Sequence, residues 1–347
     1  MKRAILQKQT KNKTVKCLAC SHYCTIPQNN VGICGVRKNI NGKLYLVVYG
    51  KAAAVNIDPV EKKPLYHFLP GREIFSFGTL GCNFSCLFCQ NWDISQLTKD
   101  IRFDPNRDEL LNEMLKKCHN LKPKQIVNYC LQHSIPAIAY TYNEPAIFFE
   151  YAYDTAKLAK KHNIKNVFVT NGYESHESLK KIKKYLDAAN IDLKSFSEEF
   201  YSKICKAKLE FVLKNIERFY NASIWIEITT LVIPNKNDSE KELTQIAEFI
   251  ASISKHIPWH VTAFHPDYKM LDTPPTPLST LLKAYKIGKK AGLKYVYIGN
   301  ILSAEYENTF CPNCNNICIA RFGFNVKNYL IDGKCKNCNN KIEGVWR

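Results

Sequence analysis

The chain has 347 residues, of which 46% are apolar, with 14 glycines and 15 prolines, a composition that excludes a disordered chain and suits a large globular domain with small modules. No apolar run approaches the roughly 18 residues that a membrane helix needs, and the first residues turn polar too early for a secretory signal, so we expect a cytoplasmic protein with no membrane partner. The net charge of +18 would suit nucleic acid, but the lysines are spread over many segments, and solvated helix faces explain them better.

The cysteines are unusually numerous, and fifteen of them in a cytoplasmic chain favour metal sites over disulfides. Eleven fall into three groups, at residues 17–34, 82–89 and 311–338. The remaining four are most simply interpreted as small buried hydrophobes: Cys118, Cys130, Cys205 and Cys318.

Residues 1–70 are predicted to form a small cysteine-rich module. Its cysteines follow the spacing C-x2-C-x3-C-x9-C, with His22 as a substitute ligand: Cys17, Cys20, Cys24 and Cys34. Four thiolates suit a closed zinc site and a second iron–sulfur cluster equally well, so both remain open. Two β-rich runs at 43–49 and 52–57 predict a hairpin around Gly50. His67 lies among aromatic residues and is predicted to be a packed histidine.

A second group of cysteines, Cys82, Cys86 and Cys89, has the spacing C-x3-C-x2-C and directly follows an apolar run at 74–80. Three thiolates on one short loop can hold three corners of a 4Fe-4S cluster, leaving the fourth iron for a substrate or cofactor. A zinc knuckle is the alternative that the spacing alone leaves open.

Residues 71–300 alternate strand-like and helix-like segments, which predicts parallel β/α units. The helices are amphipathic, and the one after Asp238 carries capping-box residues. The fold class is therefore α/β, with a partial or complete β/α (TIM-like) barrel. The expected strands are 74–80, 137–142, 166–170, 189–193, 224–233, 260–264 and 294–298.

Polar residues follow these strands where a β/α barrel places its chemistry. Turn chemistry does not explain Glu144, Lys194 and His265, because none of them is a turn-forming residue. Their position after the strands is therefore stronger evidence for a functional site than that of the other residues there. A lysine and a carboxylate in one cleft suit a ligand that itself carries an ammonium and a carboxylate. The other candidates after these strands are Asn143, Asn171 and Asp192.

Residues 301–347 carry two C-x2-C knuckles separated by twenty residues, which predicts a zinc-ribbon-like module. A rubredoxin-like iron site is the alternative. So short a segment cannot build its own core, and a closed metal site would supply its folding energy. The four predicted ligands are Cys311, Cys314, Cys335 and Cys338.

The chain resembles the radical SAM superfamily (SAM, S-adenosylmethionine), in the branch of the glycyl-radical-enzyme activases, such as pyruvate formate-lyase activating enzyme. More narrowly, it resembles the radical SAM enzyme of the AmmeMemoRadiSam system. The narrower resemblance covers nearly the whole chain and is carried by residues 17–22, 66–71, 81–92, 140–145, 258–266 and 297–300.

The resemblance implies roles for individual residues. The three loop cysteines would hold the 4Fe-4S cluster, and Phe88 would pack near the adenine of SAM. Asn143 and Glu144 stand in the place of a Gly-Gly-Glu-Pro motif that meets the methionine amino group, with Tyr142 and Asn143 replacing the two glycines. Asp192, Lys194 and His265 match SAM-site positions of the activases. Pro234 is followed by Asn235 where the narrower family has glycine, and asparagine tolerates a left-handed turn.

The resemblance also implies an activity and partners. The enzyme would cleave SAM reductively to methionine and a 5′-deoxyadenosyl radical, which abstracts hydrogen from a substrate that the sequence does not identify. A reductant such as ferredoxin or flavodoxin is expected, and a partner protein is one substrate option. Two alternatives stay open: a radical SAM enzyme that modifies RNA, and a non-enzymatic, zinc-rich protein that binds nucleic acid.

Overall fold

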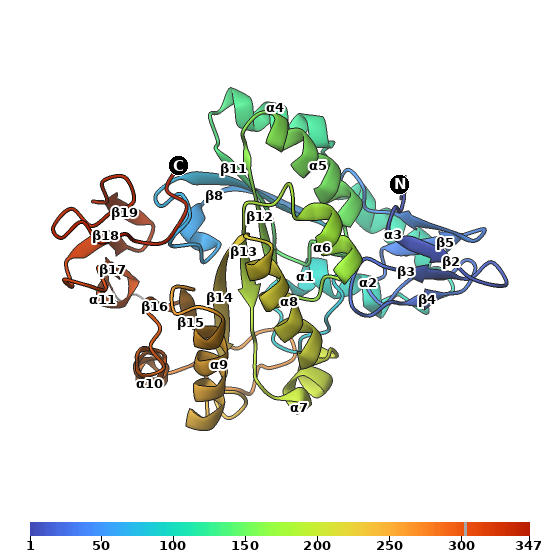
Figure 1. Cartoon of the computed structure of the whole chain (residues 1–347). Coiled ribbons are helices and arrows are strands. Elements are labelled where there is room, and N and C mark those ends of the chain that lie inside the picture. Colours follow the sequence, from blue (N-terminus) through green and yellow to red (C-terminus); the bar gives the residue numbers. More distant parts are fainter. Residues whose placement is uncertain (302–303) are drawn as a thin grey trace. The chain divides into compact units, whose positions relative to one another are not determined.

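The computed structural model describes residues 1–301 and 304–347. The chain, drawn in Figure 1 with colours that follow the sequence, forms two compact units. Unit 1 consists of Met1–Ile57, Ile74–Asp187 and Cys205–Ala207. Unit 2 consists of Asp58–Glu73, Ala188–Ile204 and Lys208–Arg347.

The core of unit 1 is a parallel arrangement of three strands, β9 (Glu73–Gly78), β11 (Ala137–Tyr140) and β12 (Lys165–Thr170). Because the strands run in one direction, the loops that follow them leave from one edge of the sheet, where open α/β sheets bind ligands. The other helices and short strands of this part are α1 (Trp92–Ser95), α2 (Leu97–Asp100), α3 (Arg107–Lys116), β10 (His119–Asn120), α4 (Pro123–Gln132), α5 (Phe149–Lys161) and α6 (His176–Ile182).

The first part of unit 1 consists of short antiparallel strands. One sheet has the order β1-β6-β5 and another the order β2-β3-β4, while β7 pairs with β10. Their bounds are β1 (Lys2–Arg3), β2 (Gln7–Gln9), β3 (Val15–Cys17), β4 (Thr25–Ile26), β5 (Arg37–Ile40), β6 (Lys43–Leu46) and β7 (Lys51–Ala52), followed by β8 (Ala54–Pro59).

The hairpin predicted around Gly50 is wrong. The hairpin lies one strand earlier, between β5 and β6, and turns at Asn41 and Gly42. Both turn residues have positive φ angles, 51° and 76°. An Asn-Gly pair is the sequence that adopts such a two-residue turn most readily, and this outweighs the β-rich composition around Gly50.

Unit 2 contains four parallel strands, β13 (Ala188–Asp192), β14 (Trp225–Val232), β15 (Trp259–Ala263) and β16 (Val296–Gly299), in sequential order. Three long helices alternate with them: α8 (Leu209–Asn221), α9 (Glu240–Ile253) and α10 (Leu278–Lys290) (Figure 1). Helix α9 begins after Ser239, whose side chain accepts a hydrogen bond from the Glu242 amide and satisfies one free donor of the first turn. Shorter elements are the 3-10 helix η1 (Val60–Lys62), α7 (Glu198–Phe200) and the π-helix η2 (Tyr201–Cys205).

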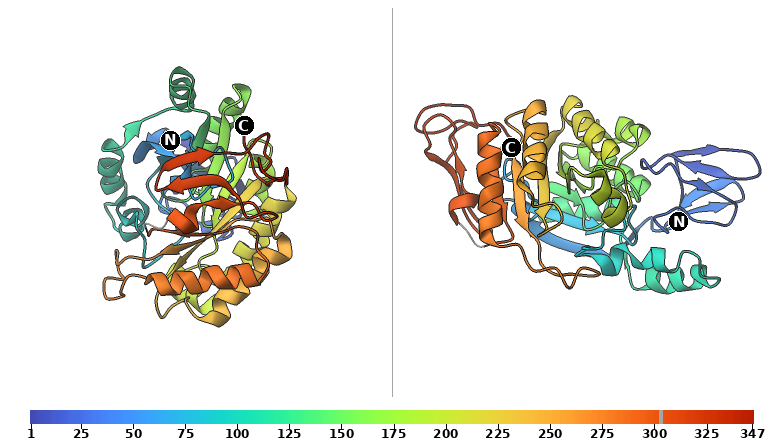
Figure 2. Two further views of the ribbon diagram at one scale, coloured as in Figure 1. Left: turned by 90° about the vertical axis from the view of Figure 1, so that its left-hand side faces the viewer. Right: turned by 90° about the horizontal axis from the view of Figure 1, so that it is seen from below.

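The end of unit 2 is a three-stranded antiparallel sheet, red in Figure 2, formed by β17 (Thr309–Phe310), β18 (Ile317–Phe322) and β19 (Asn325–Asn328) after the short helix α11 (Ala304–Glu307). Its buried side chains pack with Tyr66, Tyr295 and Tyr297, so the tail shares an apolar cluster with the rest of unit 2.

The seven strands predicted from the sequence are all present. Each begins and ends within about two residues of its predicted bounds. Helices separate the parallel strands, so the predicted α/β class is confirmed. None of the helices in the described ranges is both long and apolar enough to cross a membrane.

Candidate active site

The three-cysteine loop leaves the carboxyl end of β9 and is largely buried. Cys82 and Cys86 are 9% and 7% exposed, and Phe88 is 4% exposed, whereas Cys89 is half-buried. Burial raises the pKa of Cys82 to about 12, and burial also raises that of Cys89. Buried thiols bind metal as thiolates, so metal binding at this loop would release protons and help to order it.

A lysine that the sequence does not single out fixes the same loop. The ammonium of Lys99 donates hydrogen bonds to the Phe84 carbonyl, to Ser85 Oγ at 3.2 Å and to Gln96 Oε1 at 2.9 Å. Its positive charge acts against burial and lowers the pKa of Cys82. The only signal in the sequence is a basic residue ten positions after the last loop cysteine, which is too weak to have predicted this contact.

The loop after β11 is tied directly to the cysteine loop. Asn143 Nδ2 donates to the Gly81 carbonyl at 2.7 Å, and Asn91 Nδ2 donates to the Tyr142 carbonyl at 2.9 Å. Tyr142 has φ +68°, the left-handed conformation that glycine adopts most easily. Tyr142 therefore adopts a backbone conformation that suits glycine, although it replaces one of the glycines of the resembled motif. Neighbouring hydrogen bonds hold this conformation, which costs some local strain.

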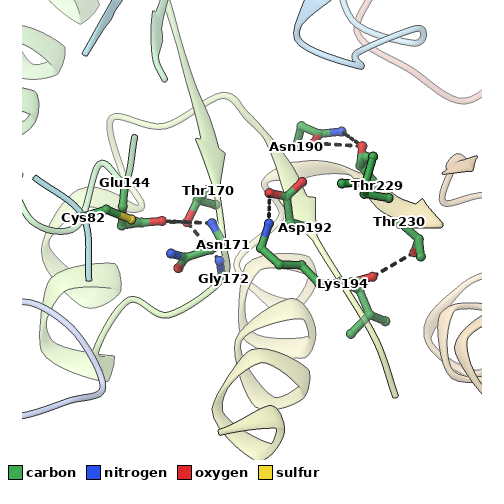
Figure 3. Close-up of polar contacts among 12 residues, drawn as sticks. Cys82, Glu144, Thr170, Asn171, Gly172, Asn190, Asp192, Lys194, Thr229 and Thr230 are labelled. Carbon is green, nitrogen blue, oxygen red and sulfur yellow. Dashed lines mark hydrogen bonds and ion pairs between the residues drawn. The ribbon is translucent and has the colours of Figure 1, made fainter. Parts of the chain in front are cut away.

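Glu144 is completely buried and is surrounded by donors (Figure 3). Its carboxylate accepts hydrogen bonds from the amides of Ala146 and Asn171, both at 2.9 Å, and lies 3.0 Å from Thr170 Oγ1. Burial raises the pKa of Glu144 well above its usual range, and the nearby Glu174 raises it further. The donors hold the carboxyl group in place at the edge of the sheet where the cysteine loop also lies.

Glu144 and Glu174 form a buried carboxyl pair joined by one hydroxyl. Thr170 Oγ1 lies 2.7 Å from Glu174 Oε1, and it also accepts a hydrogen bond from the Gly172 amide at 3.0 Å. The hydroxyl has one hydrogen and can donate to only one of the two carboxylates. Burial raises the pKa of Glu174 to about 7. The pair therefore retains a proton at neutral pH unless a cation replaces it.

Two buried polar atoms beside the cysteine loop have no hydrogen-bond partner among the described residues, Asn83 Nδ2 and Asn171 Oδ1. The other ends of these side chains are fixed to each other, because Asn171 Nδ2 donates to Asn83 Oδ1 at 2.8 Å. A buried donor and a buried acceptor without partners carry a free-energy cost that a bound polar ligand would remove. The thiols, the Glu144 carboxyl group and these amides together fit a cluster with an amino-acid-like ligand.

Unit 2 holds the other predicted ligand contacts after β13. Lys194 Nζ lies 2.6 Å from Asp192 Oδ2, and the Lys194 side chain is only 12% exposed (Figure 3). The backbone there is fixed by Asn237, which donates to the Lys194 carbonyl at 2.6 Å, and by Thr230, which donates to that of Leu193 at 2.8 Å. Asp192 and Lys194 thus form a positioned ion pair. His265 follows β15 in the same unit and is exposed.

A buried network in unit 2 adds residues that the sequence does not mark as a site. Glu227 on β14 accepts hydrogen bonds from the amides of Tyr66 and His67 at 2.9 and 2.8 Å and from His260 Nε2 at 2.7 Å. Burial lowers the pKa of His67 to about 4, so this histidine is neutral: Nδ1–H donates to a carbonyl and Nε2 accepts from Tyr297. His67 is packed, as predicted.

A cavity of about 310 Å³ lies beside this network, within unit 2. Its walls combine ionisable side chains with the ends of β15 and β16, and include Glu61, Tyr66, His260, Thr262, Asn300 and Glu307. A cavity of this size with converging polar groups is suited to a small molecule or to one side chain of a larger one.

The four tail cysteines form a group whose sulfur atoms all lie within 4.8 Å of one another. Cys311 and Cys338 are 3.5 Å apart, and Cys314 and Cys335 are 3.7 Å apart. A tetrahedral zinc ion with Zn–S bonds of about 2.3 Å needs sulfurs about 3.8 Å apart. The tail is therefore already arranged for one four-coordinate ion.

The four amino-terminal cysteines lie in unit 1. Cys17, Cys20 and Cys34 are buried and Cys24 is half-buried. Burial raises the pKa of each thiol, and the other thiols of the group raise it further, so the four lie within electrostatic range of one another.

Comparison with known proteins agrees with this arrangement. The family model described as the radical SAM superfamily matches residues 77–250. The chain is 42% identical, over 99% of its own length, to an uncharacterised protein of Methanocaldococcus jannaschii that it covers completely. A second uncharacterised protein of that organism is 24% identical over 83% of this chain and 78% of its own length. The crystal structure of Streptococcus suis SuiB has a TM-score of 0.50 at 12% identity, over 70% of this chain and 52% of that one, a likeness of fold alone.

Proposed function

Because the chain belongs to the radical SAM superfamily and is an enzyme of that class, we propose that it binds a 4Fe-4S cluster at Cys82, Cys86 and Cys89 and cleaves SAM beside it. A bound cluster of this type supplies the electron that splits SAM into methionine and a 5′-deoxyadenosyl radical, which abstracts hydrogen from the substrate. The chain's own part is to hold the cofactors and keep water away.

The observation that carries the proposal is the packing of the Glu144 carboxyl group and the cysteine loop at one edge of a parallel sheet in unit 1. Asn143 joins the two loops by its bond to the Gly81 carbonyl. We assign Glu144 to the ammonium group of SAM, because a buried carboxylate fixed by backbone amides is a suitable partner for a cation.

We assign the remaining SAM contacts by the resemblance stated above. Phe88 would pack against the adenine, and Asn143 would lie beside the methionine amino group. Asn171 is assigned to the methionine moiety on structural grounds, because its buried Oδ1 has no hydrogen-bond partner among the described residues. Asp192, Lys194 and His265 keep the same assignment as SAM-site residues. The ion pair of Asp192 with Lys194 supports it, because the lysine side chain is held in one position and its charge is partly shielded from water.

The experiment is anaerobic reconstitution followed by iron and sulfide analysis of two matched variants. We expect about four fewer iron atoms and about four fewer sulfide ions per chain than in wild type when all three cysteines are replaced, as Cys82→Ala, Cys86→Ala, Cys89→Ala. The control Cys130→Ala, which removes a buried thiol on α4 outside the three groups, should keep the wild-type content. Equal iron in wild type and the triple variant would refute the cluster assignment.

We propose a low-potential one-electron donor of the ferredoxin or flavodoxin class, and a cytoplasmic location in keeping with the many free thiols. The substrate class is tested by deuterium transfer from labelled candidates into 5′-deoxyadenosine, beginning with proteins and peptides and continuing with small molecules and RNA. A partner protein follows from the activase resemblance.

For the tail we propose zinc, held by Cys311, Cys314, Cys335 and Cys338. The sulfur spacing of 3.5 and 3.7 Å supports a four-coordinate ion. Backbone amides and the Asn337 side chain surround the thiols, and a hydrogen bond from Asn337 is the largest cause that lowers the pKa of Cys314 to about 6. Metal analysis of the aerobic protein distinguishes zinc from the rubredoxin-like alternative.

A further inference from the structure

The amino-terminal cysteines form one compact group that the function proposed above does not use. Cys17 is the last residue of β3, and Cys20 and Cys24 lie in the loop between β3 and β4. The Cys17 amide donates to the Cys24 carbonyl at 2.9 Å. Cys34 comes from the next loop, and this loop packs against the Cys24 sulfur: a Cβ atom on Gly32 would lie in ordinary van der Waals contact with it, at 3.8 Å.

The ligand pattern of this group differs from that of the tail. In the tail, two C-x2-C knuckles face each other and bring four sulfurs within 4.8 Å. In the amino-terminal group, three cysteines follow one another as C-x2-C-x3-C, which is the loop spacing C-x3-C-x2-C in reverse, and the fourth is remote. A single zinc ion needs sulfurs about 3.8 Å apart, whereas a cluster uses a different iron for each thiolate and holds the sulfurs farther apart. Three closely spaced thiolates with one remote thiolate therefore suit a cluster better than the paired knuckles of the tail do.

Cys34 touches the residue that precedes the first cysteine of the active-site loop. Gly81 adopts φ +89°, and a Cβ atom on it would lie 2.6 Å from the Cys34 carbonyl oxygen, so only glycine fits. The same carbonyl accepts a hydrogen bond from Thr98 Oγ1 at 3.0 Å. The backbone that carries Cys34 is therefore packed against the backbone that leads into Cys82.

A second contact joins the two cysteine groups. His22, between Cys20 and Cys24, donates from Nε2 to the Asn83 carbonyl at 3.0 Å, and burial lowers its pKa. Its ring also packs against Tyr173, with centroids 4.8 Å apart, and Tyr173 packs against Phe84 of the active-site loop. Buried protein thus connects the two groups through a carbonyl contact, a histidine and an aromatic pair, all within unit 1.

We propose that Cys17, Cys20, Cys24 and Cys34 hold a second iron–sulfur cluster, which relays electrons to the cluster at Cys82, Cys86 and Cys89. The relay rests on the function proposed above. In each step the external one-electron donor is oxidised by one electron and the second cluster is reduced by one. The same electron then reduces the active-site cluster, which passes it to SAM as the bond from sulfur to C5′ breaks.

The first test is metal analysis of the full chain, purified and reconstituted without oxygen. The active-site variant Cys82→Ala, Cys86→Ala, Cys89→Ala should still contain about four iron atoms and about four sulfide ions, with the absorbance and the electron paramagnetic resonance (EPR) signal of a reducible cluster. A variant with about two zinc ions and no iron would overturn the inference, since both four-cysteine groups would then be zinc sites.

The second test separates the relay from the cluster itself. In Cys20→Ser, the active-site cluster should still be reduced by dithionite, as followed by EPR, but its reduction by a ferredoxin or flavodoxin should fall to the rate of uncatalysed exchange. Equal rates of reduction by the protein donor in wild type and Cys20→Ser would overturn the relay. Because both readouts are independent of SAM cleavage, a protein with two clusters and no 5′-deoxyadenosine would contradict the proposed function alone.

Discussion

Two neighbouring carboxyl groups should respond in opposite ways to the same isosteric change. Glu144→Gln keeps the shape of the side chain but removes the negative charge that we assign to the SAM ammonium group. Glu174→Gln removes the neighbouring negative charge. In the wild type, burial and this charge together raise the pKa of Glu144. Both residues are fully buried and bonded to Thr170, so each is the control for the other.

The structure gives the expected size of the effect. A hydrogen bond to a charged group contributes about 1.5–3 kcal/mol, which corresponds to about 10- to 150-fold in Kd. Glu144→Gln should weaken SAM binding by that factor. Glu174→Gln should leave binding intact at high pH and strengthen it at lower pH, because Glu144 then ionises without a like charge beside it.

The pH dependence follows from the same pair. A cation binds the ionised form of Glu144, whose pKa is raised, so SAM affinity is fully present above the pKa of the pair and is lost as the pH falls. The loss approaches tenfold per pH unit, or about 1.36 kcal/mol. In wild type the fall should follow the raised pKa of Glu144, and in Glu174→Gln it should occur at a lower pH, because the neighbouring charge that raises this pKa is gone.

Calorimetric titration of SAM into the reconstituted, anaerobic protein measures these affinities, and buffers with different ionisation enthalpies report the protons released. Thr155→Val, at a buried threonine on α5 whose hydroxyl donates to the Tyr151 carbonyl of the same helix, is the control for the handling of variants. If Glu144→Gln binds SAM as tightly as wild type, or if Glu174→Gln loses as much affinity as Glu144→Gln, the assignment of Glu144 to the ammonium group is wrong.

Three further predictions concern cluster potential, stability and the tail. Lys99→Met should make the active-site cluster harder to reduce, because the ammonium on the Phe84 carbonyl favours the extra negative charge; a potentiometric EPR titration without a shift would contradict this. Arg37→Met should lower unfolding stability by about 3–5 kcal/mol, since it leaves the buried Glu150 without its 2.6 Å partner. Adding Glu150→Gln should recover part of that loss in thermal denaturation. Cys335→Ser should remove about one zinc ion per chain, as measured by elemental analysis, without changing the iron content.

The sequence predicts the strands well because each is a buried apolar run bounded by turn residues, a local pattern. Asn235, which stands where the resembled family has glycine, adopts the left-handed conformation that asparagine tolerates, with φ 59°. The hairpin around Gly50 fails because pairing depends on which turn closes more easily, and Asn41 with Gly42 does so one strand earlier.

For the candidate site, the sequence identifies the residues with unusual chemistry but not the ones that position them. Glu144 stands out as a charged residue after a strand. Thr170, at the end of a strand, and Glu174, in the loop after it, control its proton. Both look ordinary until the fold brings them within hydrogen-bond distance. Lys99 is equally inconspicuous among the many lysines. Such contacts join residues far apart in the chain, and no local pattern encodes them.

The central claim is that the loop after β9 holds the centre that cleaves SAM. Its most direct test is the amount of 5′-deoxyadenosine formed from SAM by the reduced, anaerobic protein. Wild type and Cys130→Ala should form it together with an equal amount of methionine, while Cys82→Ala, Cys86→Ala, Cys89→Ala should form none. Wild-type protein with a full complement of iron that makes no 5′-deoxyadenosine with any donor, or an active triple variant, would contradict the claim.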